Sequence, residues 1–247
     1  MNFTILYFDS IASTNTEALN QARQGADEGL CVVARQQTAG RGRHGRTWLS
    51  PKDAGLYFSV VLRPRVEIKF LPLITLMSAV AVFDSLTELY QINPDIKWAN
   101  DVHINEKKIC GILAEMTETK TGLAIVVGIG INLKSSNFPP ELKATATALE
   151  EETAQKIKTE TLLENLAAQM AKYYQIFQGD SGAEKIRREW TQRSSYANDK
   201  SVKVKLENEI IFGTTRGIEA NGALRVETET GETKIVQAGD VERLRKV

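Results

Sequence analysis

The chain has 247 residues, enough for one domain of ordinary size and a smaller one, and its 42% hydrophobic and 25% charged residues are typical of a globular protein. Its 31 basic and 31 acidic residues give a formal net charge of zero, which argues against a general polyanion binder. The N-terminus lacks the features of a signal peptide, and the longest apolar run, Leu123 to Leu133, is shorter than the roughly 20 residues of a membrane span. We therefore expect a cytoplasmic protein without membrane contact.

Strand and helix patterns alternate through the first two thirds of the chain. Runs of β-branched and aromatic residues predict strands at Leu30–Arg35 and Gly55–Leu62, and an apolar stretch predicts a buried helix at Leu71–Tyr90. A strand that ends in IKWANDV, a hairpin with its turn at Glu106–Lys107, and an almost wholly apolar strand at Gly122–Leu133 complete the predicted sheet.

Two amphipathic or polar helices are predicted next, and after them the pattern changes from helices to short strands. A helical stripe opened by a Thr cap covers Thr159–Gln178, and a shorter helix covers Ala183–Trp190. After Arg193 short strands alternate with turn signals, which predicts a small barrel that leans on the larger domain. Its expected strands are Val202–Leu206, Glu209–Ala220, Ala223–Thr228, Thr233–Gln237 and Val241–Arg245. We expect a larger domain over residues 1–193 and a smaller one over residues 194–247.

The two cysteines, Cys31 and Cys110, lie in apolar runs, and no CxxC pattern or disulfide framework is present. Buried thiols in a reducing compartment are the simplest interpretation. A disulfide and a nucleophilic thiol are the alternatives.

The segment QQTAGRGRHGRTW, Gln36–Trp48, is the most unusual in the chain and is called the Gly-Arg loop below. It combines three arginines with three glycines, and no Asp or Glu occurs from Gly29 to Lys52. Glycines allow backbone N–H groups to approach an anion, and arginine offers planar donors to phosphate or carboxylate. The loop is neither a Walker motif nor a dinucleotide fingerprint. A solvated flexible loop and an Arg/Gly nucleic-acid contact remain as alternatives.

Other short segments offer polar groups that each have a simpler structural explanation. Lys108 begins an apolar strand and could extend into solvent, whereas Gly111 leaves room for a flat ligand on the sheet. Asn100 and Asp101 could be turn formers, and so could Asn132. Ser13, Thr14 and Asn15 precede a helical pattern, where capping would explain one of the three.

Taken together, these segments closely resemble the biotin protein ligases. The resemblance lies in AGRGRHGRTW, KWAND, KKICGILAE and VVGIGINL, and in the opening DSIASTN and the ending GDVERLR, and covers nearly the whole chain. It implies an α+β fold, in which a mixed sheet flanked by helices is similar to class II aminoacyl-tRNA synthetase and lipoate ligase domains and is followed by an SH3-like barrel. Because the Ser-Thr-Asn segment starts at Ser13, we expect the ligase-only form without a DNA-binding domain.

The resemblance also assigns roles to individual residues. Arg43, Lys108 and Asp101 are expected to be catalytic, with Asp101 orienting or deprotonating an acceptor lysine. The residues expected to bind biotin are Ser13, Thr14, Asn15, Gln37, Gly40, Arg41, Gly42, Arg43, Lys108 and Gly111. The residues expected to bind ATP are Arg43, Arg46, Trp48, Lys97, Asn100 and Asn132. No metal site of the protein's own is expected.

The implied activity is ATP-dependent attachment of biotin to a lysine of a biotin carboxyl carrier protein, through biotinyl-5′-AMP. Biotin and ATP are the expected ligands, with Mg²⁺ arriving on ATP; the carrier protein is the expected partner, and a homodimer is left open. The sequence departs from the family at Ala99, where proline is usual, and at His44 and Cys110. A lipoate or octanoate ligase, a nucleic-acid-binding module and an inactive biotin binder are the rival interpretations.

Overall fold

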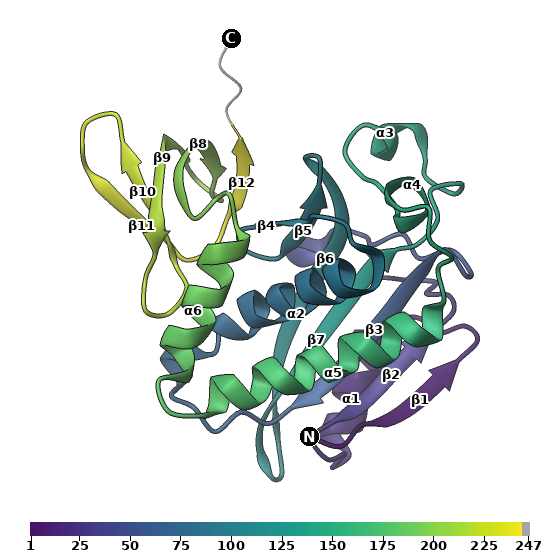
Figure 1. Ribbon diagram of the computed structural model, residues 1–247. Coiled ribbons are helices and arrows are strands. Elements are labelled where there is room, and N and C mark those ends of the chain that lie inside the picture. The colour runs from purple at the N-terminus through teal and green to yellow at the C-terminus, as the bar shows by residue number, and fades with distance from the viewer. Residues whose placement is uncertain (244–247) are drawn as a thin grey trace.

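The computed structural model describes residues 1–243, and its larger part is built on a seven-stranded mixed sheet. The strand order is β1-β2-β3-β7-β6-β5-β4, with β1 parallel to β2 and the other pairs antiparallel (Figure 1). The strands are β1 (Thr4–Phe8), β2 (Leu30–Ala34), β3 (Gly55–Leu62), β4 (Asp95–Lys97), β5 (Asp101–Ile104), β6 (Lys107–Thr119) and β7 (Gly122–Asn132).

The helices lie on both faces of this sheet. They are α1 (Thr14–Arg23), α2 (Leu73–Tyr90), α3 (Pro140–Lys143), α4 (Leu149–Glu152), α5 (Thr159–Gln178) and α6 (Gly182–Arg193), with 3₁₀ turns at Arg43–Gly45 and Ile68–Phe70. Figure 1 shows α2, α5 and α6 packed together on one side of the sheet.

The alternation of side chains along β7 explains how the two faces differ. Ile125, Ile129 and Ile131 point into the main core with α2 and α5, whereas Ala124 and Val126 pack in a second cluster with α1. Further along the α1 face the residues of β7 are glycines, so nothing fills the space beyond the first turn of α1. A cleft can therefore form on this face, beside the first turn of α1.

Most of the predicted elements are confirmed, with small shifts at their ends. β1 was not predicted, nor were α3 and α4. The hairpin turn lies at Asn105–Glu106 rather than one residue later, and both of its residues have positive φ, as a tight two-residue turn requires. The expected Thr cap of α5 is wrong, because Lys158 occupies the N-cap position and makes no side-chain cap bond.

The C-terminal residues form a five-stranded antiparallel sheet, in the order β11-β10-β9-β8-β12. Its strands are β8 (Asn198–Lys205), β9 (Ile210–Ile218), β10 (Leu224–Thr228), β11 (Thr233–Val236) and β12 (Asp240–Arg243). The expected closed barrel is not observed: over residues 1–243, β11 and β12 are unpaired edges of an open sheet. Leu244 and Arg245 of the last predicted strand lie outside the described residues.

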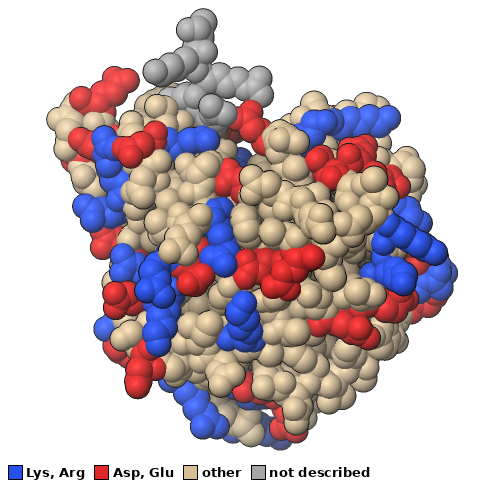
Figure 2. Space-filling view, viewed as in Figure 1, with Lys and Arg blue, Asp and Glu red and all other residues tan. Residues whose placement is uncertain are grey.

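This second sheet packs directly on the larger part of the molecule, as the sequence predicted. Buried residues of β8, β9 and β10 belong to the same core cluster as α2 and α5. Trp98 Nε1 donates to the carbonyl of Gly222 at 2.9 Å, and Arg187 donates to the carbonyl of Ile218 at 2.9 Å. Figure 2 shows positive and negative side chains interspersed on the visible face, without a large patch of one sign.

Two further expectations concern α2 and the cysteines. By length and composition α2 could cross a membrane, but 67% of it is buried inside the molecule, so it is explained as a core helix. Both cysteines are buried and free, as the simplest interpretation predicted. Burial raises the pKa of Cys31 to about 12 and also raises the pKa of Cys110, which makes both thiols poor nucleophiles.

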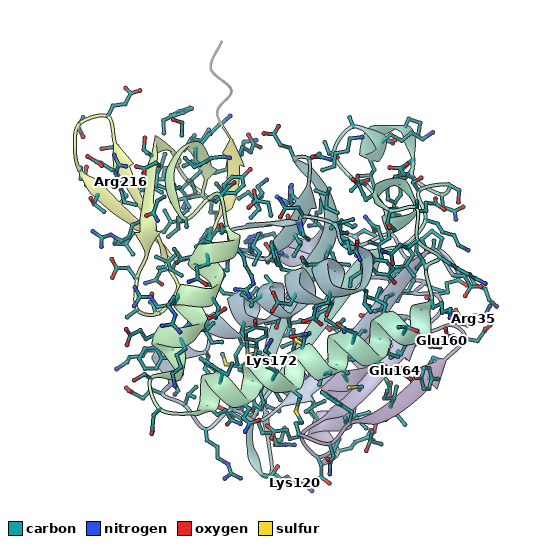
Figure 3. All side chains as sticks on the ribbon, viewed as in Figure 1. Arg35, Lys120, Glu160, Glu164, Lys172 and Arg216 are labelled. Atoms are coloured by element: carbon teal, nitrogen blue, oxygen red, sulfur yellow. The ribbon has the colours of Figure 1, made fainter. Side chains whose placement is uncertain are left out.

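Replacing Leu166 by alanine tests the packing of α5 on the core. Leu166 is fully buried, so we expect Leu166→Ala to lower the free energy of unfolding by about 2–5 kcal/mol in urea titrations. Glu164, labelled on the exposed side of α5 in Figure 3, is the matched control. Glu164→Ala should change stability by less than about 0.5 kcal/mol. Equal effects of the two substitutions would contradict the observed orientation of the helix.

Candidate active site

A cleft of about 760 Å³, counting its space open to solvent, lies on the α1 face of the large sheet. It contains most of the residues singled out from the sequence: Ser13, Thr14, Asn15, Gln37, Arg41, Gly42, Arg43, Arg46, Trp48, Asn100, Asp101, Lys108 and Gly111. Residues from distant parts of the chain thus meet in one place.

The floor of the cleft is a pair of glycines under an indole ring. Gly111 of β6 pairs with Gly130 of β7, and the two have no side chains to cover the sheet. A Cβ atom on Gly130 would lie 2.4 Å from Trp48 Nε1, and one on Gly111 would lie 3.0 Å from the same ring. The ring therefore packs directly against backbone, and Lys108 Nζ lies 5.4 Å from its centroid, within cation–π range.

The start of α1 and Gln37, which follows β2, supply a set of polar groups that we call the cradle: Ser13, Thr14, Asn15 and Gln37. Ser13 caps the helix, since its Oγ accepts from Thr16 N at 3.4 Å. The amide N–H and hydroxyl of Thr14 both donate to Gln37 Oε1, at 2.8 and 3.1 Å. Capping thus explains one member of the cradle, and the side chain of Gln37 holds another from across the cleft.

Asn15 is held on three sides. Its Oδ1 accepts from the hydroxyl of Ser59 at 2.7 Å, and its Nδ2 donates to Leu113 O at 3.1 Å and to Glu115 Oε2 at 3.0 Å. It sits against Gly128, where a Cβ would lie 2.1 Å from Asn15 Oδ1. With both donors of its amide in use, Asn15 shapes the cleft through its position rather than by offering free donors.

Each arginine of the Gly-Arg loop binds a different element. Arg41 Nη2 donates to Glu115 Oε1 of β6 at 2.5 Å, and Arg43 Nη1 donates to Asn100 Oδ1, before β5, at 2.8 Å. Arg46 forms an ion pair with Asp240 of β12. The loop is therefore docked over the cleft, with Arg41 and Arg46 paired to carboxylates and Arg43 bound to a neutral amide; it is not the solvated flexible loop considered as an alternative.

Lys108 and Asp101 form an ion pair inside the cleft, with Lys108 Nζ 2.7 Å from Asp101 Oδ1. Burial alone would raise the pKa of Asp101, but the nearby ring of His103 and the ammonium of Lys108 outweigh it and lower the pKa to about 2. His103 Nδ1 donates to Glu106 O at 3.1 Å, and its Nε2 lies 3.9 Å from Asp101 Oδ2. The carboxylate is ionised at neutral pH, so it can attract and orient a cation.

Three of the predicted site residues do not line this cleft. Gly40 is buried, and its carbonyl accepts from Trp48 N at 2.9 Å. Asn132 Nδ2 donates to Thr147 O at 3.0 Å and to Lys108 O at 3.4 Å, so it supports the strand rather than facing the cavity. Lys97 lies in a neighbouring polar groove, where burial lowers its pKa.

That neighbouring groove joins the two sheets and shares residues with the cleft. It has a volume of about 590 Å³ with its open space. Arg46, Lys97 and Lys205 bring positive charge into it, whereas its carboxylates come from Asp101, Asp240 and Glu242. The groove therefore connects the floor of the cleft with β12 of the C-terminal sheet.

Sequence reasoning missed several residues of the site: Tyr57, Ser59, Glu115, Gly128, Gly130 and Asp240. Tyr57 and Ser59 lie in a strand that reads as wholly apolar, and only the pairing of Ser59 with Gly128 shows that they face the cleft. The period of two along β7 could have identified Gly128 and Gly130, four and two residues before Asn132. Asp240 carried no local signal, because its role depends on how the second sheet packs.

No three His, Cys, Asp or Glu side chains come together as a metal site anywhere in residues 1–243. The two carboxylates of the cleft, Asp101 and Asp240, are engaged by Lys108 and Arg46. These residues fit a divalent ion only as part of a ligand that carries its own oxygen donors.

Comparisons with known proteins agree with this geometry. The biotin/lipoate A/B protein ligase family matches residues 7–132, and the biotin protein ligase C-terminal domain matches residues 199–244. The bifunctional ligase/repressor BirA of Bacillus subtilis (strain 168) is 37% identical over 96% of this chain and 73% of its own length. The biotin–[acetyl-CoA-carboxylase] ligase of Mycobacterium tuberculosis is 31% identical over 94% of this chain and 86% of its own.

The fold agrees as well. The biotin protein ligase of Aquifex aeolicus, in a complex with biotin and ATP, superposes with a TM-score of 0.83 at 30% identity, covering 98% of this chain and 99% of that one. The α+β architecture is thus that of a biotin protein ligase, with an open antiparallel sheet as its C-terminal part. The chain belongs to the biotin/lipoate A/B protein ligase family.

Proposed function

We propose that this protein activates biotin with ATP and attaches it to a lysine of a biotin carboxyl carrier protein. In the first step the biotin carboxylate attacks the α-phosphorus of ATP, which gives biotinyl-AMP and releases pyrophosphate. In the second step the ε-amine of the acceptor lysine attacks the mixed anhydride, which gives an amide and releases AMP. Both steps depend on positioning and on charge stabilisation more than on a covalent intermediate with the protein.

Gly111 and Gly130 place no side chain on the floor, the indole ring of Trp48 lies directly against them, and Lys108 lies beside that ring in the same cleft as the cradle. Two anions, a carboxylate and a phosphate, must approach each other in the first step. A cation at that place lowers their repulsion and stabilises the charge that develops.

Of the two roles expected of Asp101, this proposal keeps the orientation of the acceptor lysine. Its ionised carboxylate can attract and orient the ammonium of an acceptor lysine, as it does that of Lys108 in the structure. Exchange of one ammonium for another at the same carboxylate needs no proton transfer to Asp101. The ammonium of the acceptor lysine must lose a proton to solvent before its nitrogen can attack the mixed anhydride.

On the nucleotide side, Arg43, Arg46 and Asn100 border the cleft, and Trp48 covers its floor. Lys97 joins them from the neighbouring groove, which suits the outgoing phosphates. Mg²⁺ bound to the phosphates of ATP would supply further positive charge there. Asn132 contributes through its hold on the backbone of Lys108.

The remaining assignments concern the organisation and partners of the chain. We place the boundary of a catalytic domain, residues 1–193, and a C-terminal domain, residues 194–247, at the end of α6. The carrier protein is the proposed partner, and neither DNA binding nor dimer formation is needed for the chemistry. A nucleic-acid-binding module is disfavoured, because all three arginines of the loop are bound to other residues of the chain and the formal net charge is zero.

The proposed activity can be tested by ATP–pyrophosphate exchange with the purified protein. We expect exchange with biotin and none with lipoate, with octanoate or without an acid. Exchange with lipoate or octanoate alone would identify a neighbouring ligase instead, and no exchange with any acid would refute the proposed adenylation.

Lys108→Ala tests the role of the cation. Loss of one donor to developing charge should slow biotin-dependent exchange by about 10²–10³-fold. Lys107→Ala, one residue earlier in β6 and outside the cleft, is the matched control and should keep near wild-type exchange. If both variants exchanged at the wild-type rate, Lys108 would have no part in adenylation.

Arg43→Gly tests whether the docked loop retains the reactive intermediate. Without the bond from Arg43 to Asn100 the loop loses one of its attachments, and we expect biotinyl-AMP to escape and label lysines of an added bystander protein. His44→Gly is the control, since glycine suits its φ of 53° and all three arginines stay in place. Bystander labelling is measured by avidin blot, and labelling confined to the carrier in Arg43→Gly would count against this role.

A further inference from the structure

The carboxylate of Glu115, outside the cleft, connects the Gly-Arg loop with the cradle, two groups of residues that lie apart in the sequence. Glu115 of β6 accepts from Arg41 of the Gly-Arg loop through Oε1 at 2.5 Å, and from Asn15 of the cradle through Oε2 at 3.0 Å. Its side chain is 23% exposed, whereas Asn15 is 4% exposed. Glu115 does not line the cleft, so it has no direct contact with a ligand there.

The opposite end of the loop is joined to the cradle as well. Gln37 Nε2 donates to Ser50 Oγ at 2.7 Å, and Ser50 Oγ donates to Trp48 O at 3.1 Å. Two connections thus link the loop to the cradle: one runs from Arg41 through Glu115 to Asn15, and one runs from Trp48 through Ser50 to Gln37, which itself belongs to the loop. The two connections differ in one respect: only that through Glu115 is made between charged groups.

The chemistry of the two contacts requires a carboxylate at position 115. Both partners, the guanidinium of Arg41 and the amide Nδ2 of Asn15, are donors, so both oxygens of residue 115 must accept. Glutamine offers one oxygen and one NH₂, and would place a donor against one of the two donors. An ordinary exposed ion pair would be insensitive to this difference and would contribute little.

We propose that Glu115 is a positioning residue, which holds the closed Gly-Arg loop in register with Asn15 of the cradle. The proposal rests on the proposed function, because it assigns the cradle and Arg41 to biotin. Glu115 acts through these two residues and not on the ligand. It sets the affinity for biotin, whereas the chemical step depends on Lys108.

The test uses Glu115→Gln, with Glu118→Gln as the matched control. Glu118 is an exposed residue of the same strand and lies on its opposite face. In ATP–pyrophosphate exchange we expect Glu115→Gln to raise KM for biotin about tenfold, the scale of one charge-assisted hydrogen bond, with kcat nearly unchanged. Cleavage of the ligand-free loop by subtilisin should be faster than in wild type, while Tm stays close to the wild-type value. Glu118→Gln should match wild type in all of these.

A double-mutant cycle with Arg41→Met shows whether Glu115 and Arg41 act together on the loop or independently of each other. If Glu115 acts through Arg41, the effect of Glu115→Gln on loop cleavage should largely disappear in the Arg41→Met background. Additive effects would overturn the proposal, and so would an unchanged KM with wild-type loop cleavage in Glu115→Gln.

Two safeguards keep the test decisive. Should Glu115→Gln fail to fold, Glu115→Asp, which keeps the charge but withdraws it by one methylene, carries the same measurements. Cleavage of the loop by subtilisin needs no ligase activity. It therefore tests the link from Arg41 through Glu115 to Asn15 even if the wild-type protein shows no ATP–pyrophosphate exchange with any acid. Absence of exchange by the wild-type protein would refute the proposed function and, with it, the assignment of biotin affinity to Glu115.

Discussion

The pairing of β6 with β7 is the constraint on which the site depends. It sets Gly111 opposite Gly130, and Gly128 opposite Leu113, on the same face of the sheet. Because the same two strands bury isoleucines on their other face, a shift of register by one residue would exchange the two faces completely. The core that stabilises the fold therefore also fixes the place where side chains are missing. The cleft is a consequence of hydrophobic packing, and the loop and the cradle are built around it.

The Gly-Arg loop shows how a strongly basic segment is accommodated in a chain of zero net charge. Its three arginines bind Glu115, Asn100 and Asp240, which come from β6, from the residue before β5 and from β12. None of these partners is near the loop in sequence, so the absence of acidic residues from Gly29 to Lys52 does not mean that the charge is unpaired. An anionic ligand must compete with these partners, and its binding exchanges contacts instead of filling empty donors.

Much of the fold and part of the site followed from local patterns. The buried helix α2, the strands β2, β3 and β7 and the turns at Gly222 and Gly231 carry their signals in a few consecutive residues. The edge strand β1 was missed although TILYF is rich in β-branched and aromatic residues, because the strand is short and only its pairing with β2 shows that it belongs to the sheet. The sequence predicted a small SH3-like barrel, and the described strands form an open five-stranded sheet, because short strands with turns specify that a sheet forms, but not whether its edges meet. The site residues found from sequence were those with unusual local chemistry, and those missed, such as Ser59 and Asp240, are ordinary residues that the packing of distant segments brings to the cleft.

Asp240 also shows why the two sheets are parts of one site. It lines both the cleft and the groove beside it, and its partner Arg46 belongs to the loop that covers the cleft. The carbonyl of Gly222 accepts from Trp98, in the segment that leads to Asn100 and Asp101, so the same sheet contacts the site from a second direction. Removal of the C-terminal sheet would expose the apolar side chains it shares with α2 and α5 and would release the loop at Arg46. The small sheet thus contributes to the stability of the core and to the shape of the cleft through the same packing.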